Sequence, residues 1–195
     1  MTIVGTQPLV LENRHTGERL ALRRFEQGDE VWLELKGSLP PHQEGPPMHV
    51  HFDEDEEGQI KAGTLSATID GRHVTVPAGG SAWIPRGAMH RWWNAGDDTL
   101  VFEGVVRPVV DLDRYLQAIF DIMNASPSGR PSLFYVAHAF LRHRRTQAPA
   151  MMPGPVQGVL FRAIVALGTV LGKYRGNDWP GCPARCLGAP LTTDA

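Results

Sequence analysis

The stretch that decides the fold is GPPMHVHFDEDEEGQIKAG, residues 45–63. It places His49 and His51 one residue apart and follows them with an unbroken run of carboxylates at residues 53–57. If the chain is extended here, the two imidazoles point to the same side, because alternate side chains of a strand share a face. The stretch is therefore either one half of a metal site or a solvated acidic loop that contains histidine.

A second stretch, GGSAWIPRGAMHRWWN at residues 79–94, sets a third histidine in a regular spacing. It fits the pattern G-x5-P-x-G-x2-H-x3-N, with His90 at the histidine position and Asn94 at the end. The first stretch fits G-x3-H-x-H-x4-E-x6-G, with Glu56 as its acidic residue. Two independent patterns thus agree on a site with three imidazoles and one carboxylate.

Strand-like segments surround both stretches, from residue 8 to about residue 107. Many of them alternate apolar and polar residues with a period of two, and Gly, Pro, Asn or Asp separates them. No helical stretch interrupts them, so the pattern favours an antiparallel sandwich or barrel over a sheet built from βαβ units. The segments are PLVLEN, LALRRF, EVWLEL, TLSATI, HVTVP, SAWIP, HRWWN and TLVFEGVV.

The two spacing patterns resemble those of the cupin superfamily, and the resemblance covers about residues 30–107. It implies a mainly β fold, a jelly-roll-like antiparallel β-barrel over residues 1–108 with a C-terminal α-helical extension. Carried over position by position, it places the metal ligands at His49, His51, Glu56 and His90. Glu56 is chosen over its acidic neighbours because its interval to Gly63 also fits. The leading glycine stands nearer the first histidine than in the usual form, which affects the turn more than the ligands.

This ligand set predicts one divalent metal ion. Three imidazoles and a carboxylate suit Fe, Mn, Ni, Co, Cu or Zn, and no thiolate in the set selects a softer metal. Four protein ligands leave positions open for substrate, oxygen or water. Glu56 is also the candidate catalytic residue, since a partly detached carboxylate can carry a proton. The alternative is a barrel that keeps the pattern and binds no metal.

The substrate pocket at this site is expected to be mainly apolar. Trp92 has the same strand parity as His90 and should face inward. Gly58 stands where cupins often carry a bulky side chain, so the resemblance implies a roomy cavity. The predicted wall residues are Trp92, Trp83, Phe102, Leu33, Leu35 and Gly58. Such a lining suits a small hydrophobic or aromatic molecule, although plain core packing is the alternative explanation for each tryptophan.

After residue 108 the apolar pattern changes to a period of 3.6. We predict a helical extension over residues 109–175, packed on the barrel or on a dimer partner, and an irregular tail over residues 176–195. The helices are expected at residues 112–123, with Asp111 as the N-cap, and within 131–145 and 156–174. Their apolar stripes exceed what one barrel wall needs, so we expect a homodimer whose extension helps form the interface or covers the barrel mouth.

The last of these helices contains the most apolar segment of the chain. Residues 156–173 approach the length of a membrane span. Arg162 lies inside the segment, however, and a charge there is costly in a bilayer. We therefore predict a helix packed on protein and no membrane partner.

Composition excludes other classes of function. The 195 residues carry a formal charge of −2, which gives no basic face for nucleic acid. The first residues lack a basic segment followed by an apolar core, so we expect a cytoplasmic protein. Cys182 and Cys186 are expected to be a reduced pair or part of a frayed tail rather than a structural disulfide. A zinc site would need two more ligands nearby, and the sequence shows none.

These observations support three hypotheses of function. The leading one is a metal-dependent enzyme, an oxidoreductase with dioxygenase-like chemistry, that acts on a small hydrophobic or aromatic molecule. The second is a non-oxidative isomerase, cyclase or lyase that uses the metal only as a Lewis acid. The third is a ligand-binding or sensory module without catalysis.

Overall fold

The structure is a computed structural model that describes residues 2–186. The chain divides into two compact units. The first unit contains residues 1–110 and 145–151, and the second contains residues 111–144 and the chain from residue 152 onward.

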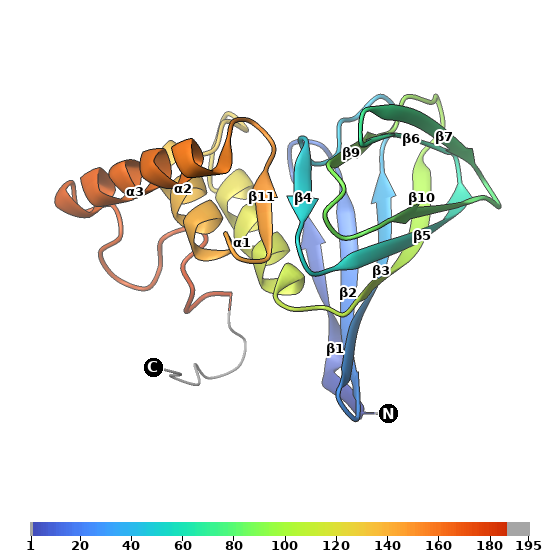
Figure 1. Cartoon of the computed structure of the whole chain (residues 1–195), viewed down its shortest axis with the longest axis horizontal. Coiled ribbons are helices and arrows are strands. Elements are labelled where there is room, and N and C mark those ends of the chain that lie inside the picture. Colours follow the sequence, from blue (N-terminus) through green and yellow to red (C-terminus); the bar gives the residue numbers. More distant parts are fainter. Residues whose placement is uncertain (1, 187–195) are drawn as a thin grey trace. The chain divides into compact units, whose positions relative to one another are not determined.

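The first unit is built from two antiparallel sheets (Figure 1). The six-stranded sheet has the order β1-β2-β3-β10-β5-β8, and the five-stranded sheet has the order β11-β4-β9-β6-β7. The strands of the six-stranded sheet are β1 (Thr2–Glu12), β2 (Arg19–Gln27), β3 (Glu30–Leu39), β5 (Asp55–Ala62), β8 (Ser81–Ile84) and β10 (Leu100–Arg107). Those of the five-stranded sheet are β4 (His49–His51), β6 (Thr64–Ile69), β7 (Arg72–Pro77), β9 (His90–Trp93) and β11 (Gln147–Pro149).

The two sheets share one apolar core. Side chains alternate between the faces of each strand, and in β10 the buried set is Leu100, Phe102 and Val106. The ring of Phe102 meets that of Trp92 on β9 edge to face, with 5.2 Å between the ring centres, so the two sheets are joined there. The predicted mainly β, jelly-roll-like fold is thus confirmed in the form of two packed sheets.

Beyond the eight predicted segments and β4, whose extended conformation the sequence indicates only conditionally, the structure contains two more strands. One is β5, which includes the second half of the acidic run and pairs with β10 and β8. The other is β11, which lies within the predicted helical extension and pairs with β4 in the register Gln147 to His51 and Pro149 to His49. β5 carries the candidate ligand Glu56, and β11 pairs with the strand that carries His49 and His51, so both strands help to position the site.

The second unit contains the three helices expected from the sequence. They are α1 (Leu112–Asn124), α2 (Leu133–Arg142) and α3 (Gly154–Val170). Asp111 occupies the N-cap position of α1 as predicted, but its side chain makes no capping hydrogen bond. Its carboxylate accepts a hydrogen bond from Nδ1 of His143 at 2.5 Å, so it connects the start of α1 to the end of α2.

Within the single chain, α3 does not pack through the apolar stripe that was predicted to face the barrel or a dimer partner. Gln157, Phe161 and Gly168 are the buried residues of this helix. The residues of the predicted stripe are all exposed, and Val170 keeps 80% of its accessible surface; they are Val156, Val159, Leu160, Ala163, Leu167, Val170 and Leu171. Apolar residues lie on both sides of the helix, so periodicity could not select the packed side.

Within residues 2–186, no helix is long and apolar enough to cross a membrane.

The predicted tail is described only in part. Residues 176–186 form turns without a helix or strand, and Cys182 and Cys186 are free thiols with buried side chains. The remainder of the predicted tail, residues 187–195, lies outside the described residues.

Candidate metal centre

Three strands bring together the four side chains that the sequence patterns select. His49 and His51 lie on β4, Glu56 lies on β5 and His90 lies on β9. One potential ligand atom from each residue lies within 4.8 Å of the others. His49 and His90 are register partners of neighbouring strands, which explains how histidines 41 positions apart meet.

The carboxylate of Glu56 faces two of the imidazoles. Its Oε1 lies 2.9 Å from Nε2 of His51 and 3.6 Å from Nε2 of His90. The His49 ring completes the group, with its centre 4.1 Å from that of His90 and 4.9 Å from that of His51. The four donors thus converge on one point.

Hydrogen bonds fix the orientation of all three rings. Each Nδ1 lies within hydrogen-bond distance of an oxygen that can only accept, so each Nδ1 carries the hydrogen and each Nε2 is left as a potential metal ligand. The three bonds join His49 to the Pro47 carbonyl at 2.8 Å, His51 to the Glu54 carboxylate at 3.2 Å and His90 to the Ala88 carbonyl at 3.0 Å. This arrangement is the one that histidine ligands of metals adopt.

One of these Nε2 atoms is buried and lacks a hydrogen-bond partner. It belongs to His90, which is 1% exposed, and no group among residues 2–186 bonds to it. A buried polar atom of this kind is costly unless a partner occupies the space in front of it. A divalent cation among the four donors would supply that partner, so the residues fit a metal.

The pKa shifts of His49 and Glu56 favour the deprotonated forms that bind a metal, whereas that of His51 favours the protonated ring. Burial and the neighbouring imidazoles lower the pKa of His49 to about 3. Burial alone would raise the pKa of Glu56, but His51 and His90 together hold it well below its usual value. Burial opposes the charged form of His51 as well, yet Glu56 and Glu54 raise its pKa to about 9. Metal ligands must be deprotonated, so binding at this site would release a proton from His51.

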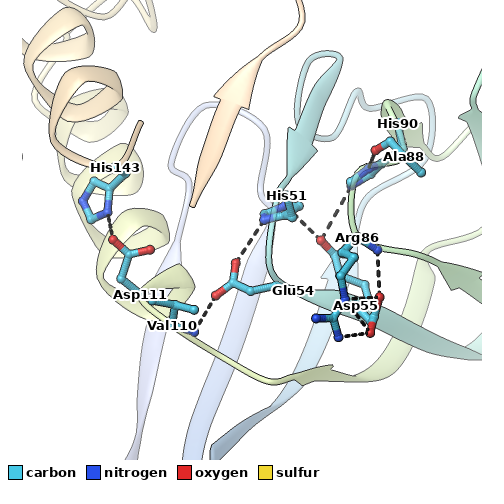
Figure 2. A network of polar contacts seen from close by, with 10 residues as sticks. His51, Glu54, Asp55, Arg86, Ala88, His90, Val110, Asp111 and His143 are labelled. Atoms are coloured by element: carbon cyan, nitrogen blue, oxygen red, sulfur yellow. Dashed lines mark hydrogen bonds and ion pairs between the residues drawn. The ribbon is translucent and has the colours of Figure 1, made fainter. Parts of the chain in front are cut away.

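The acidic residues 53–57 do not form one solvated run, because three of them make different contacts within the protein. Glu56 joins the cluster, and Glu54 is buried behind His51. Asp55 between them points away and binds the side chain and backbone N–H of Arg86 (Figure 2). Arg86 belongs to the turn that precedes β9, so this ion pair fastens the start of β5 to the segment that leads to His90.

An apolar cavity opens beside Glu56. It has a volume of about 70 Å³, and its walls are mainly apolar. The lining residues come from both sheets and are Leu35, Glu56, Glu57, Gly58, Ile60, Leu65, Ala67, Ala82, Ile84, Trp92, Phe102, Gly104 and Val106.

Four of the six predicted wall residues line this cavity, namely Leu35, Gly58, Trp92 and Phe102. Leu33 does not, although it is buried two positions along β3 from Leu35. Trp83 does not line it either: its side chain is 63% exposed. Its neighbours Ala82 and Ile84 have the opposite parity on β8 and form the wall in its place.

Several residues of the site were not selected from the sequence. Ile60 and Val106 line the cavity, and a signal for them exists, because they share strand parity with Glu56 and Phe102. Glu54 was visible only as one member of an acidic run. Its role depends on a contact that spacing does not reveal.

Comparison with known families agrees with this geometry. A family model described as a cupin domain matches residues 36–106. This part of the chain belongs to the cupin superfamily. The matched segment begins in β3 and ends in β10, so the cupin domain includes all four clustered side chains and every lining residue of the cavity except Leu35.

Part of the chain also resembles part of a curated protein. The oxidoreductase iacF of Pestalotiopsis fici is 37% identical over 79 residues, which make up 39% of this chain and 39% of that protein. The match therefore spans well under half of the relative.

Solved structures with a similar fold share little sequence with this chain. An RmlC-like cupin from Shewanella frigidimarina has a TM-score of 0.45 and 17% identity over 56% of this chain and 96% of its own. KdgF from a Halomonas species has a TM-score of 0.43 and 15% identity over 55% and 97%. A predicted oxalate decarboxylase from Thermotoga maritima has a TM-score of 0.40 and 21% identity over 56% and 100%.

Proposed function

We propose that the cupin domain is a metal-dependent oxidoreductase that acts on a small hydrophobic or aromatic molecule with dioxygenase-like chemistry. One divalent ion would be held by His49, His51, Glu56 and His90. The observation that carries the proposal is the convergence of four oriented donors at the edge of an apolar cavity. The partial match to an oxidoreductase favours the oxidative class over the alternatives.

The bound ion would act as a Lewis acid and, if it is iron, manganese or copper, would also exchange electrons. The chain contributes the surroundings. The apolar walls bind the substrate by excluding water and direct it toward the open positions. Glu56 is the group that lies both in the ligand cluster and in the cavity wall, so its carboxylate can take a proton from the substrate and return it.

Elemental analysis of untagged protein tests the metal site. We expect about one equivalent of a transition metal per chain in the wild type, and its loss in His49→Ala and in His90→Ala. His15→Ala is the matched control, because this histidine is exposed and lies outside the cluster. Wild-type protein that contains no metal and takes up no added divalent ion would overturn the proposal.

Oxygen consumption separates the classes of chemistry. The metal-loaded protein is incubated with a panel of small aromatic compounds, and oxygen uptake and product formation are followed together. Turnover that consumes oxygen supports the oxidoreductase. Turnover that continues without oxygen identifies the isomerase, cyclase or lyase class, and saturable binding without turnover identifies a binding module.

We also propose that the chain forms a homodimer. The support is the apolar side of α3, where Val159, Leu167 and Val170 are all more than half exposed in the single chain. A second copy is the partner that would cover this surface.

A further inference from the structure

We propose that Glu54 is a positioning residue that orients His51 toward the metal and makes it the strongest imidazole donor of the site. The inference rests on the proposed metal site and extends it to a residue that belongs to neither of the two spacing patterns.

The carboxylate of Glu54 is held from both sides. The residue is 1% exposed. One oxygen, Oε2, lies 3.2 Å from Nδ1 of His51, and the other, Oε1, accepts a hydrogen bond from the backbone N–H of Val110 at 2.7 Å. Figure 2 shows this arrangement, with Glu54 between His51 and the chain at Val110. The side chain therefore has little freedom, and neither has the ring that it holds.

The carboxylate of Glu54 contacts the imidazole of His51 and the backbone N–H of Val110, and no lysine or arginine donates to it among these contacts. A buried carboxylate is costly unless positive charge lies close to it. The adjacent group that can carry positive charge is the imidazole of His51, whose other nitrogen points into the ligand cluster. A metal ion on that nitrogen would take over the balancing charge. Positive charge on His51 thus balances the buried carboxylate of Glu54, and a bound metal ion would do the same through the His51 ring.

Glu54 also makes the three imidazoles unequal. Nδ1 of His49 and Nδ1 of His90 face neutral backbone carbonyls, those of Pro47 and Ala88. His51 alone among the three faces a carboxylate. An anionic acceptor draws the Nδ1 hydrogen and raises the electron density at Nε2, so a metal bound there receives more charge than from the other two rings.

A purely structural role is the competing explanation, because the bond to Val110 also fastens the end of the cupin domain. The two roles predict different results. A structural residue changes the stability of the fold and leaves the properties of a bound metal unchanged. A positioning residue changes the affinity and the electronic spectrum of the metal in protein that is still folded.

Cobalt(II) titration tests the inference. Wild type, Glu54→Gln and the control Asp53→Asn are each titrated with Co²⁺, and the visible absorption bands are recorded. The control removes a charge from the same acidic run at an exposed position. We expect Glu54→Gln to weaken cobalt binding by about 10- to 100-fold and to shift its bands, and Asp53→Asn to leave both unchanged.

The outcomes distinguish this inference from the proposed function. Glu54→Gln that binds cobalt with wild-type affinity and bands, but unfolds at a lower temperature, overturns the positioning role and leaves the metal site intact. Wild type that fails to bind cobalt overturns the metal site and this inference with it. If Glu54→Gln does not fold, Glu54→Asp takes its place: it keeps the charge but withdraws it from His51, so the same weakening and band shift are expected.

Discussion

Asn94 ends the second spacing pattern, yet it serves the fold rather than the metal. Its side chain is fully buried. Its Nδ2 lies within 3.0 Å of the carbonyl oxygens of Leu39, Pro40 and Asp98, and its Oδ1 accepts the N–H of Gly96. The amide thus binds the loop before β10 to the end of β3, and it supports the strand order rather than the ligands.

We expect Asn94→Ala to lower the free energy of unfolding by about 2–3 kcal/mol, because buried carbonyl groups lose their donor. Urea denaturation followed by circular dichroism measures this change, with exposed Asn177→Ala as the control. The cobalt affinity of the folded fraction should stay within a factor of a few of the wild type. Equal stability of Asn94→Ala and wild type would contradict the structural role.

Glu18 is a second buried carboxylate, and it lies outside the site. It is 9% exposed, and burial raises its pKa from 4.5 to about 7. In the unfolded chain the carboxyl group ionises at its ordinary pKa, whereas in the folded protein it keeps its proton up to about pH 7. The folded state therefore binds more protons between these values, and Glu18 makes the protein less stable as the pH rises through this range.

Glu18→Gln removes this ionisation. We expect its free energy of unfolding to differ little from the wild type near pH 4 and to exceed it by up to about 3 kcal/mol at pH 8. Denaturation at both values measures the difference, and exposed Glu26→Gln should show no such change between them. An effect of Glu18→Gln that is the same at pH 4 and pH 8 would show that the carboxyl group ionises alike in both states.

At the scale of single elements, β5 combines a ligand and the space for a substrate. Glu56 and Gly58 lie on the same face of this strand and both line the cavity. A Cβ at Gly58 would meet no atom within 4 Å, so a side chain there would project into open space. Its register partner Gly104 has no room for a side chain, because a Cβ there would lie 2.9 Å from the carbonyl oxygen of Glu57.

We expect Gly58→Leu to fill the cavity without disturbing the metal ligands. Binding of 2-naphthol, followed by its fluorescence, should weaken at least about tenfold, since the apolar surface that it would cover is occupied. Gly58→Ala should have a smaller effect, and both variants should retain metal. Unchanged naphthol binding by folded Gly58→Leu would show that the ligand occupies a different place.

The elements also show what the sequence could and could not predict. Regular spacing revealed β4 and β9, because both ligand patterns lie on them. β5 was missed because its first residues are charged, and charge alone does not distinguish a solvated run from a strand with one face in a cavity. β11 was missed because three residues ending at Pro149 give no pattern of their own, and the strand exists only through pairing with β4.

At the scale of the whole molecule, the chain passes between its two units more than once. It leaves the cupin unit after Val110 and returns at Arg145, where it adds β11 beside the strand with two of the candidate ligands. It leaves again at Met152 to form α3. Each unit is therefore made of two separate segments of the chain. The change in the period of the apolar pattern near residue 108 could mark only one boundary between the units.

The homodimer is the prediction that belongs to this scale. The large exposed apolar residues of α3 lie on one side of the helix, at Val156, Val159, Leu160, Leu167 and Val170, and the C-cap residue Leu171 is exposed as well. Arg162 and Thr169 lie toward a different side. A surface of this kind is unfavourable in water, so a second copy that covers it should associate strongly.

Sedimentation equilibrium of wild type, Leu167→Glu and Thr169→Glu tests this association. We expect a dimer for the wild type and for Thr169→Glu, and a monomer for Leu167→Glu, because a charge at the centre of the covered surface would be buried without a partner. Circular dichroism of all three proteins should be the same, which would show that the helix persists. A monodisperse wild-type monomer would remove the dimer, and a Leu167→Glu dimer would place the interface on another part of the chain.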